Sequence, residues 1–156
     1  MKVRFRRSIF GTRTGEASAN SGHISSTLGL TLTNVTLDSS SSDGLVNTAA
    51  ALLSNVTLAN SGGYGLVNTG TLAISNSIVA GSGGADCLSS GTIAANPHNL
   101  IEDGACSPAL SGDPVLSNLG DYGGETETLA LLPGSPALDA GDDASCQTAD
   151  QRGVAR

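Results

Sequence analysis

The sequence predicts an all-β protein, a parallel β-helix (solenoid) with coils of about 21 residues and a loop-rich C-terminal closing segment. Three asparagines, Asn34, Asn55 and Asn76, recur at a strict spacing of 21 residues without a gap. Apolar and polar residues alternate around them with the period of a strand, and Gly- and Ser-rich loops leave no room for a helix within one copy. Stacked copies place identical residues roughly 4.8 Å apart, which buries aliphatic columns inside a solenoid.

The repeat divides the chain into three regions. Residues 1–27 are a basic leader with a candidate degenerate coil, residues 28–92 hold three coils, and residues 93–156 form the C-terminal cap. The three aligned copies are 30–50, 51–71 and 72–92, with turn loops at 39–43, 60–63 and 81–85. Three apolar columns are expected inside: Leu32/Leu53/Ile74, Leu37/Leu58/Val79 and Val46/Val67/Leu88. Ile24 lies 21 residues before Leu45 and marks the candidate degenerate coil.

The column Asn34, Asn55 and Asn76 is interpreted as structural. Asparagine tolerates left-handed backbone at a bend, and its amide can hydrogen-bond to the coils above and below, so we expect an asparagine ladder. The alternative is glycosylation, because Asn34-Val35-Thr36 and Asn55-Val56-Thr57 both fit the acceptor pattern. The third copy, Asn76-Ser77-Ile78, breaks that pattern, which favours the structural interpretation.

Charge is distributed unevenly along the 156 residues, which carry a formal net charge of −7. The five cations of the leader are Lys2, Arg4, Arg6, Arg7 and Arg13. From residue 14 onward, 14 acidic residues face 2 basic ones, and such a body repels nucleic-acid phosphates. No apolar stretch after the leader is long enough for a signal peptide, and none in the chain for a transmembrane segment. We therefore expect no nucleic-acid partner, and a chain that is the C-terminal piece of a longer protein with upstream coils.

The second half carries motifs that identify a family. They are Asp86-Cys87, Asn99-Leu100-Ile101, Asp113-Pro114, Gly123-Gly124, the string LLPGSPALDAG at 131–141 and the string DQRG at 150–153. With the coils, they make residues 28–156 resemble the choice-of-anchor Q domain, the C-terminal region of bacterial right-handed parallel β-helix surface proteins. The resemblance implies a secreted or cell-surface protein of the bacterial envelope. It implies no catalytic residue at any position of this chain.

The cysteines and one arginine are candidate structural residues. Cys87 and Cys106 lie 19 residues apart, close to one coil, so we expect them on adjacent turns as a disulfide, with Cys146 left over. Metal binding by the cysteines is the weaker alternative, because the ligand spacing is wrong and only His23 and His98 are available. Arg152 is expected to pair with Asp139 or Asp150 and hold the C-terminal end together.

The functional hypotheses are a non-catalytic structural or adhesive segment, a polysaccharide-active lyase or hydrolase with catalytic coils upstream, and a carbohydrate-binding module. The coils lack Lys and Arg for lyase chemistry, and their carboxylates Asp43 and Asp86 are expected to be solvated turn residues. We therefore expect no enzyme activity and no cofactor, with surface glycans or envelope components as partners. The weak calcium candidates are Asp139, Asp142, Asp143 and Asp150.

Overall fold

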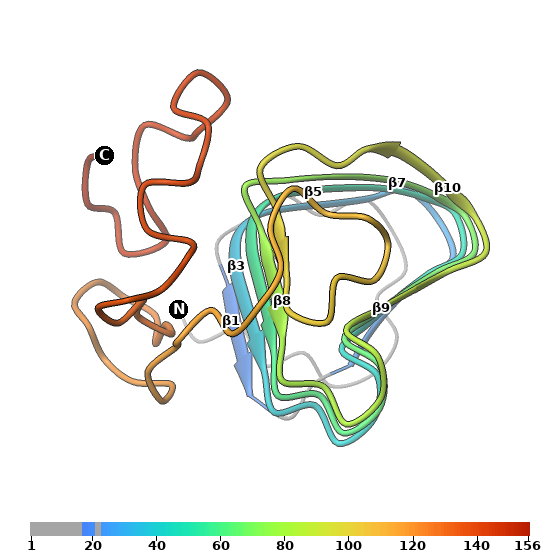
Figure 1. The fold of residues 1–156 in the computed structure, drawn as a ribbon, viewed down its shortest axis with the longest axis horizontal. Coiled ribbons are helices and arrows are strands. Elements are labelled where there is room, and N and C mark those ends of the chain that lie inside the picture. Colours follow the sequence, from blue (N-terminus) through green and yellow to red (C-terminus); the bar gives the residue numbers. More distant parts are fainter. Residues whose placement is uncertain (1–16, 21–22) are drawn as a thin grey trace.

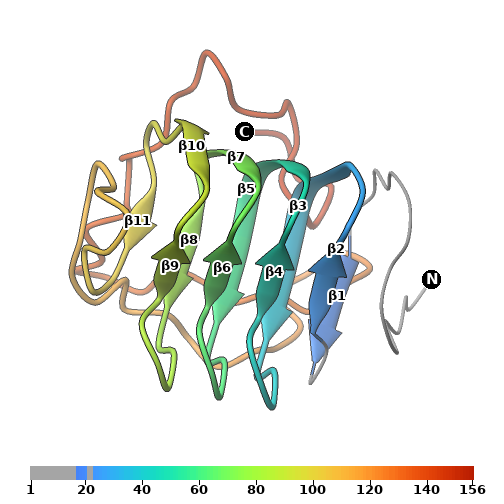
Figure 2. The same ribbon diagram turned by 90° about the vertical axis from the view of Figure 1, so that its right-hand side faces the viewer.

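The computed structural model describes residues 17–20 and 23–156, with side chains from residue 23 onward; most of the basic leader lies outside these residues. The described chain winds into a right-handed parallel β-helix, seen along its axis in Figure 1 and from the side in Figure 2. The fold class predicted from the sequence is therefore confirmed. No helix of the described part is long and apolar enough to cross a membrane.

Eleven strands form the described solenoid. In chain order they are β1 (Ala17–Asn20), β2 (Ile24–Ser26), β3 (Leu30–Asp38), β4 (Leu45–Asn47), β5 (Ala50–Ala59), β6 (Leu66–Asn68), β7 (Thr71–Ser75), β8 (Ile78–Ala80), β9 (Cys87–Ser89), β10 (Thr92–Ala95) and β11 (Leu100–Ile101). One sheet has the order β1-β3-β5-β7-β10 with β8 and β11 as a branch, and the other has the order β2-β4-β6-β9.

The register of these strands follows the sequence repeat. Every pairing from β3 to β8 joins residues that are 21 apart, for example Leu32↔Leu53 and Leu53↔Ile74. Strands β3 and β5 each bend once, so that a coil presents three faces and each turn of chain closes a triangular section (Figure 1). In the region of the expected degenerate coil, β2 pairs with β4 in the register Ile24↔Leu45.

Two of the three predicted apolar columns form the core. Leu32, Leu53 and Ile74 are at most 5% exposed, and the Leu37 column is buried as well. The third prediction was wrong: Val46 and Val67 are half-buried and Leu88 is 45% exposed, because the column beside them points inward instead. That inward column is Ile24, Leu45, Leu66 and Cys87. Adjacent residues of a strand point to opposite faces, so Leu45 and Val46 cannot both be internal.

A ladder of polar side chains runs through the core beside these leucines. Asn47 and Asn68 are 0% exposed, and the Nδ2 atom of Asn47 donates to Oδ1 of Asn68 at 2.8 Å. Asn68 in turn donates to Oγ of Ser89 at 3.0 Å and to the carbonyl of Thr92 at 3.2 Å. Each amide thus satisfies its neighbour one coil away, as buried polar groups require. The asparagine ladder exists, but in a column other than the predicted one.

The third coil ends in a short irregular turn that covers the core. Strand β11 pairs with β8, and the Leu110 backbone pairs with Leu100 above it. Asn99, which is 0% exposed, donates to the carbonyl of Ile74 at 2.9 Å and accepts from the backbone N–H of Ser77 at 2.9 Å. Residues 99–110 are the part of the predicted cap that closes the solenoid.

The remainder of the C-terminal region does not extend the cap. From about residue 113 the chain turns back and runs beside the face formed by β3 and β8 (orange to red in Figures 1 and 2). It holds three isolated antiparallel bridges, Leu116↔Leu131, Gly120↔Thr128 and Ala149↔Ala155. We call residues 113–156 the tail.

The internal ladder makes Asn68 a sensitive position. Asn68→Ala removes an acceptor from Asn47 and two donated hydrogen bonds, so we expect the free energy of unfolding to fall by about 2–4 kcal/mol. Urea denaturation followed by circular dichroism measures the change. The matched control is Asn118→Ala at an exposed position of the tail, which should shift stability by less than about 0.5 kcal/mol. Equal effects of the two substitutions would contradict the ladder.

Candidate functional site

The predicted asparagine column sits at the bend between two faces of the coil. Asn34, Asn55 and Asn76 have φ values of 54°, 54° and 49°, so the left-handed backbone expected of them is present. The expected hydrogen bonds among them are not: Oδ1 of Asn34 and Nδ2 of Asn55 are buried without a hydrogen-bond partner in the described structure. The hydrogen bonds of these side chains go to the tail, because the bend turns them out of the core.

The tail crosses the three bends one after another, in reverse chain order. Asn76 accepts from the backbone N–H of Asp142 at 2.9 Å, Asn55 accepts from the thiol of Cys146 at 3.6 Å, and Asn34 donates to the carbonyl of Ala149 at 3.1 Å. Next to Asn34, the hydroxyl of Thr36 donates to the side chain of Gln151 at 2.7 Å. The asparagine column is therefore the track on which residues 142–151 dock.

A cleft of about 250 Å³ lies between this track and the tail. Its apolar lining comes mainly from Ile78, Leu100, Leu110 and Leu131. Its polar lining comes from Asn55, Asn76, Ser77, His98, Cys146 and Arg156. A small, mostly apolar cleft with a few convergent polar groups is the usual form of a small-ligand site. This cleft is the candidate functional site of the described chain.

Cys146 is the nucleophilic group of the cleft. Its thiol is free and partly buried, and Nη1 of Arg156 donates to the sulfur at 2.8 Å. The bond to Asn55 completes the contacts of the sulfur that the structure shows. Sequence reasoning marked Cys146 only as a leftover thiol and did not single out Arg156. The one available signal was that Arg152 and Arg156 are the only Lys or Arg after residue 13.

The four calcium candidates are not gathered into one site. No cluster of three or more metal-ligating side chains occurs among residues 23–156. Asp142 is engaged within its own turn, where the Ser145 hydroxyl and the Ala144 N–H hydrogen-bond to its carboxylate and lower its pKa below the usual value. Asp150 is engaged by Arg152, which itself supplies a positive charge. Both carboxylates are thus hydrogen-bonded within the tail.

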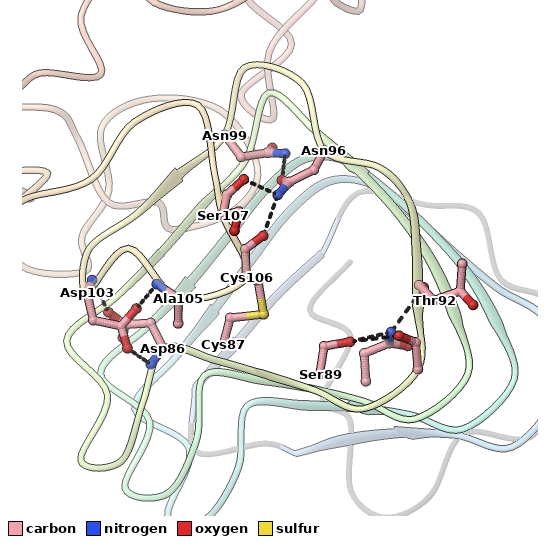
Figure 3. The surroundings of a disulfide bond; sticks show 12 residues. Asp86, Cys87, Ser89, Thr92, Asn96, Asn99, Asp103, Ala105, Cys106 and Ser107 are labelled. Carbon is pink, nitrogen blue, oxygen red and sulfur yellow. Dashed lines mark hydrogen bonds between the residues drawn. A yellow bond between two sulfur atoms is a disulfide. The ribbon is translucent and has the colours of Figure 1, made fainter.

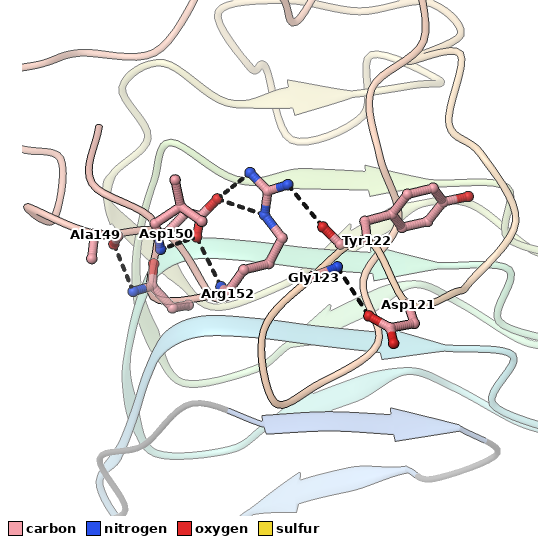
Figure 4. A network of polar contacts seen from close by, with 8 residues as sticks. Asp121, Tyr122, Gly123, Ala149, Asp150 and Arg152 are labelled. Atoms are coloured by element: carbon pink, nitrogen blue, oxygen red, sulfur yellow. Dashed lines mark hydrogen bonds and ion pairs between the residues drawn. The ribbon is translucent and has the colours of Figure 1, made fainter.

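The predicted ion pair of Arg152 forms with Asp150 and not with Asp139 (Figure 4). Both Nε and Nη2 of Arg152 donate to one oxygen of Asp150, at 2.8 and 2.6 Å, and Nη1 donates to the carbonyl of Tyr122 at 3.2 Å. The tail loops meet closely here: Gly124, at φ +94°, leaves no room for a Cβ, which would lie 2.6 Å from the Cα of Arg152. The ion pair lies within one loop, and Arg152 joins that loop to a second loop of the tail through Tyr122 and Gly124.

The pKa of Asp150 reflects these contacts. Partial burial opposes its ionisation, but the hydrogen bonds from the Arg152 side chain and from the backbone N–H groups of Val154 and Arg152 outweigh burial and lower the pKa. A carboxyl whose pKa is lower in the folded than in the unfolded chain stabilises the fold at high pH. That contribution is lost as pH falls below about 4 and through the folded pKa.

The predicted disulfide between Cys87 and Cys106 is confirmed (Figure 3). It ties the closing turn to strand β9 with a Cα–Cα distance of 5.9 Å. Beside it, Asp86 and Asp103 each accept the other's backbone N–H, at 3.2 and 2.9 Å. The expectation of a solvated Asp86 was wrong, because this carboxylate is 4% exposed and fastens the same turn.

Of the remaining sequence candidates, Asp43 and His23 form hydrogen bonds between successive coils. Asp43, in the turn between β3 and β4, accepts from the backbone N–H of Tyr64 one coil later at 2.9 Å. His23 lies at 3.0 Å from the carbonyl of Asp43, whereas His98 lines the cleft. Asp43 therefore serves the same inter-coil bonding as the asparagine ladder.

Comparisons with family models, with curated proteins and with solved structures found no match for this chain. The class that its fold and cleft define is a disulfide-closed parallel β-solenoid with a docked C-terminal tail.

The disulfide should contribute on the order of 3 kcal/mol, since it closes a loop of 19 residues. We expect reduction, or the double substitution Cys87→Ser and Cys106→Ser, to lower the melting temperature by roughly 10 °C. Alkylation under denaturing conditions without reductant should modify one thiol, Cys146, and intact mass would show it. Three alkylated thiols in unreduced protein would refute the disulfide.

The Arg152–Asp150 pair should stabilise the docked tail by about 1 kcal/mol at neutral pH, since the arginine side chain is 36% exposed. We expect Arg152→Ala to speed hydrogen exchange in the tail and to leave exchange in the coils unchanged. Wild-type protection of the Val154 N–H should fall as pH drops below about 4, because Asp150 then becomes protonated. Asp150→Asn should show no such pH dependence; wild-type-like exchange and melting in Arg152→Ala would contradict the role of the pair.

Proposed function

We propose that this chain is a non-catalytic structural or adhesive segment of a secreted or cell-surface bacterial β-helix, and that its C-terminal half closes the solenoid. The observation that carries the proposal is the closing turn at residues 99–110. This turn supplies a last strand, a buried asparagine and a disulfide, all acting on the third coil.

Every solenoid needs a segment that covers the open end of its last coil. The last coil otherwise presents unpaired strand edges and an apolar core to solvent, both of which promote association. Here β11 pairs with β8, and Leu100 and Ile101, at 2% and 1% exposure, lie over the end of the core. An end that is covered and covalently fixed supports a role as a durable module that does not associate through this end.

Two further observations support the location and the class. A disulfide between adjacent coils is typical of proteins that fold outside the reducing cytosol. The carboxylates of the coils bond to neighbouring coils: Asp38 accepts from Asn60 at 2.7 Å and Asp43 from the Tyr64 N–H. Carboxylates that hydrogen-bond to neighbouring coils favour a structural role over the pair of catalytic carboxylates that a hydrolase needs.

An adhesive contribution has one specific candidate. Tyr64 is 38% exposed at the turn between β5 and β6 and lies against Gly84 of the next coil, 3.2 Å from where a Cβ of Gly84 would be. An aromatic face on a flat Gly-rich turn is a suitable surface for stacking a sugar ring. Binding of glycans in an array, lost in Tyr64→Ala, would favour adhesion, whereas no binding would favour a passive spacer.

The closing role is tested by opening the end. Ile101→Asp places a carboxylate in the last core position, so we expect the closing turn to detach and the protein to associate, as measured by light scattering and thioflavin T fluorescence. Ile101→Val is the matched control and should remain monomeric. An opened variant, identified by protease cleavage within 102–112, that stays monomeric would contradict the closing role. Release of reducing ends or unsaturated products from acidic polysaccharides by the wild type would contradict the non-catalytic assignment.

A further inference from the structure

The cleft between the solenoid and the tail contains a reactive group that the structural role does not use. Of the three cysteines, two form the disulfide and the third, Cys146, lines the cleft with its sulfur free. The cleft also contains a guanidinium, an imidazole and two carboxamides, from Arg156, His98, Asn55 and Asn76. Reactive cysteines lie in partly exposed positions beside positively charged groups, whereas thiols buried in a closed core are inert.

The contacts of the sulfur suit both of its protonation states. As a thiol, Cys146 donates to Oδ1 of Asn55 at 3.6 Å, and the Nδ2 atom of the same amide is buried without a partner in the described chain. A half-turn of this amide exchanges the two atoms and directs an N–H toward the sulfur. The thiolate then accepts from Asn55 and from Arg156, which already lies 2.8 Å away.

The charges around the cleft select the kind of molecule that fits. The chain as a whole repels anions, with a net charge of −7, yet Arg156 and His98 both line this cleft. The carboxylate of Asp142 accepts from the Ser145 hydroxyl at 2.7 Å and from the Ala144 N–H at 3.1 Å, and it lies near His98, so Arg156 is the group of the cleft lining that provides positive charge to an anionic ligand. A guanidinium is a preferred partner for a carboxylate, which it can bind through two hydrogen bonds.

The size and the apolar side of the cleft limit the ligand further. A volume of about 250 Å³ matches a short chain of a few carbon atoms. Ile78, Leu100, Leu110 and Leu131 provide a surface for methylene groups opposite the polar rim. The ligand chemistry that matches is a carboxylate on a few carbon atoms, brought within reach of a sulfur nucleophile.

We propose that the cleft captures small carboxylate-bearing disulfides through Cys146. The Cys146 thiolate attacks one sulfur of the disulfide, a new S–S bond forms to that sulfur, and the original S–S bond breaks. The second half leaves as a thiolate and takes up the proton that Cys146 lost, so the small disulfide is the oxidant and no other reagent is needed. The captured group then lies on the leucine-rich wall, with its carboxylate against Arg156 and His98.

The test compares two small disulfides of opposite charge, dithiodipropionate and cystamine, on the whole protein. Intact mass and peptide mapping follow adduct formation at Cys146 over time. We expect the folded protein to react about tenfold faster with dithiodipropionate, the difference that one ion pair of about 1.4 kcal/mol provides. In urea the order should reverse, because the net charge of −7 then favours the cationic reagent.

Variants distinguish the contribution of the cleft from the reactivity of the thiol itself. Arg156→Gln should lose the preference for the carboxylate reagent while Cys146 remains reactive, and Cys146→Ser should form no adduct. His98→Asn, which keeps a residue tolerant of the φ of 54° at this position, should weaken the preference in part. Equal or faster reaction of the folded protein with cystamine would overturn the proposal, as would a preference that survives Arg156→Gln, or a Cys146 that neither reagent modifies in the folded protein. None of these outcomes bears on the closing role.

Discussion

Parallel hydrogen bonding between successive coils is the constraint on which the other features of the structure depend. Through the three repeats, residues of paired strands lie 21 apart in the sequence, so a side chain lies above its own copy in the next coil. The core therefore consists of columns of like residues, in which small aliphatic side chains stack on one another. This explains how a chain with 3% aromatic residues builds a closed core. The register slips between Ile93 and Ala95 in β10, close to where the sequence repeat ends.

The same constraint makes buried amides acceptable. An isolated asparagine in an apolar core is costly, because its donors and acceptor lack partners. At a spacing of one coil, Asn68 accepts from Asn47 and donates to Ser89 and to the Thr92 carbonyl, which end the row. Asn99 then performs a related task at the closing turn, where no further copy follows. Because the asparagine recurs one coil later, it finds the hydrogen-bond partner that an isolated buried amide would lack.

The sequence predicted the solenoid, its period, the disulfide and the two columns around Leu32 and Leu37, because each leaves a periodic or pairwise trace. It could not choose between Leu45 and Val46 as the internal residue, since a three-residue strand contains too little alternation to fix its phase. Asn47 and Asn34 both have a copy 21 residues later, so periodicity alone could not say which asparagine lies inside.

The path of the tail was beyond prediction for a different reason. The tail has no repeat, and several of its contacts with the coils use backbone atoms, such as the Ala149 carbonyl and the Asp142 N–H, which carry no residue signature. The cleft exists only because the tail docks there, so its lining joins residues as far apart as Asn55 and Arg156. The cleft could therefore not be predicted from the sequence without first knowing the position of the tail.

Tail and coils are stabilised by different interactions, and this difference shapes what the cleft can do. The coils rest on buried aliphatic columns, whereas the tail meets the bends through hydrogen bonds, and its own ion pair is partly exposed. Such a segment opens at lower free energy than the core it covers. Detachment of the tail would separate Cys146 and Arg156 from Asn55 and Asn76 and so remove the cleft. The disulfide joins the closing turn to strand β9 and does not involve the tail, so closure of the solenoid end does not depend on the docking of the tail.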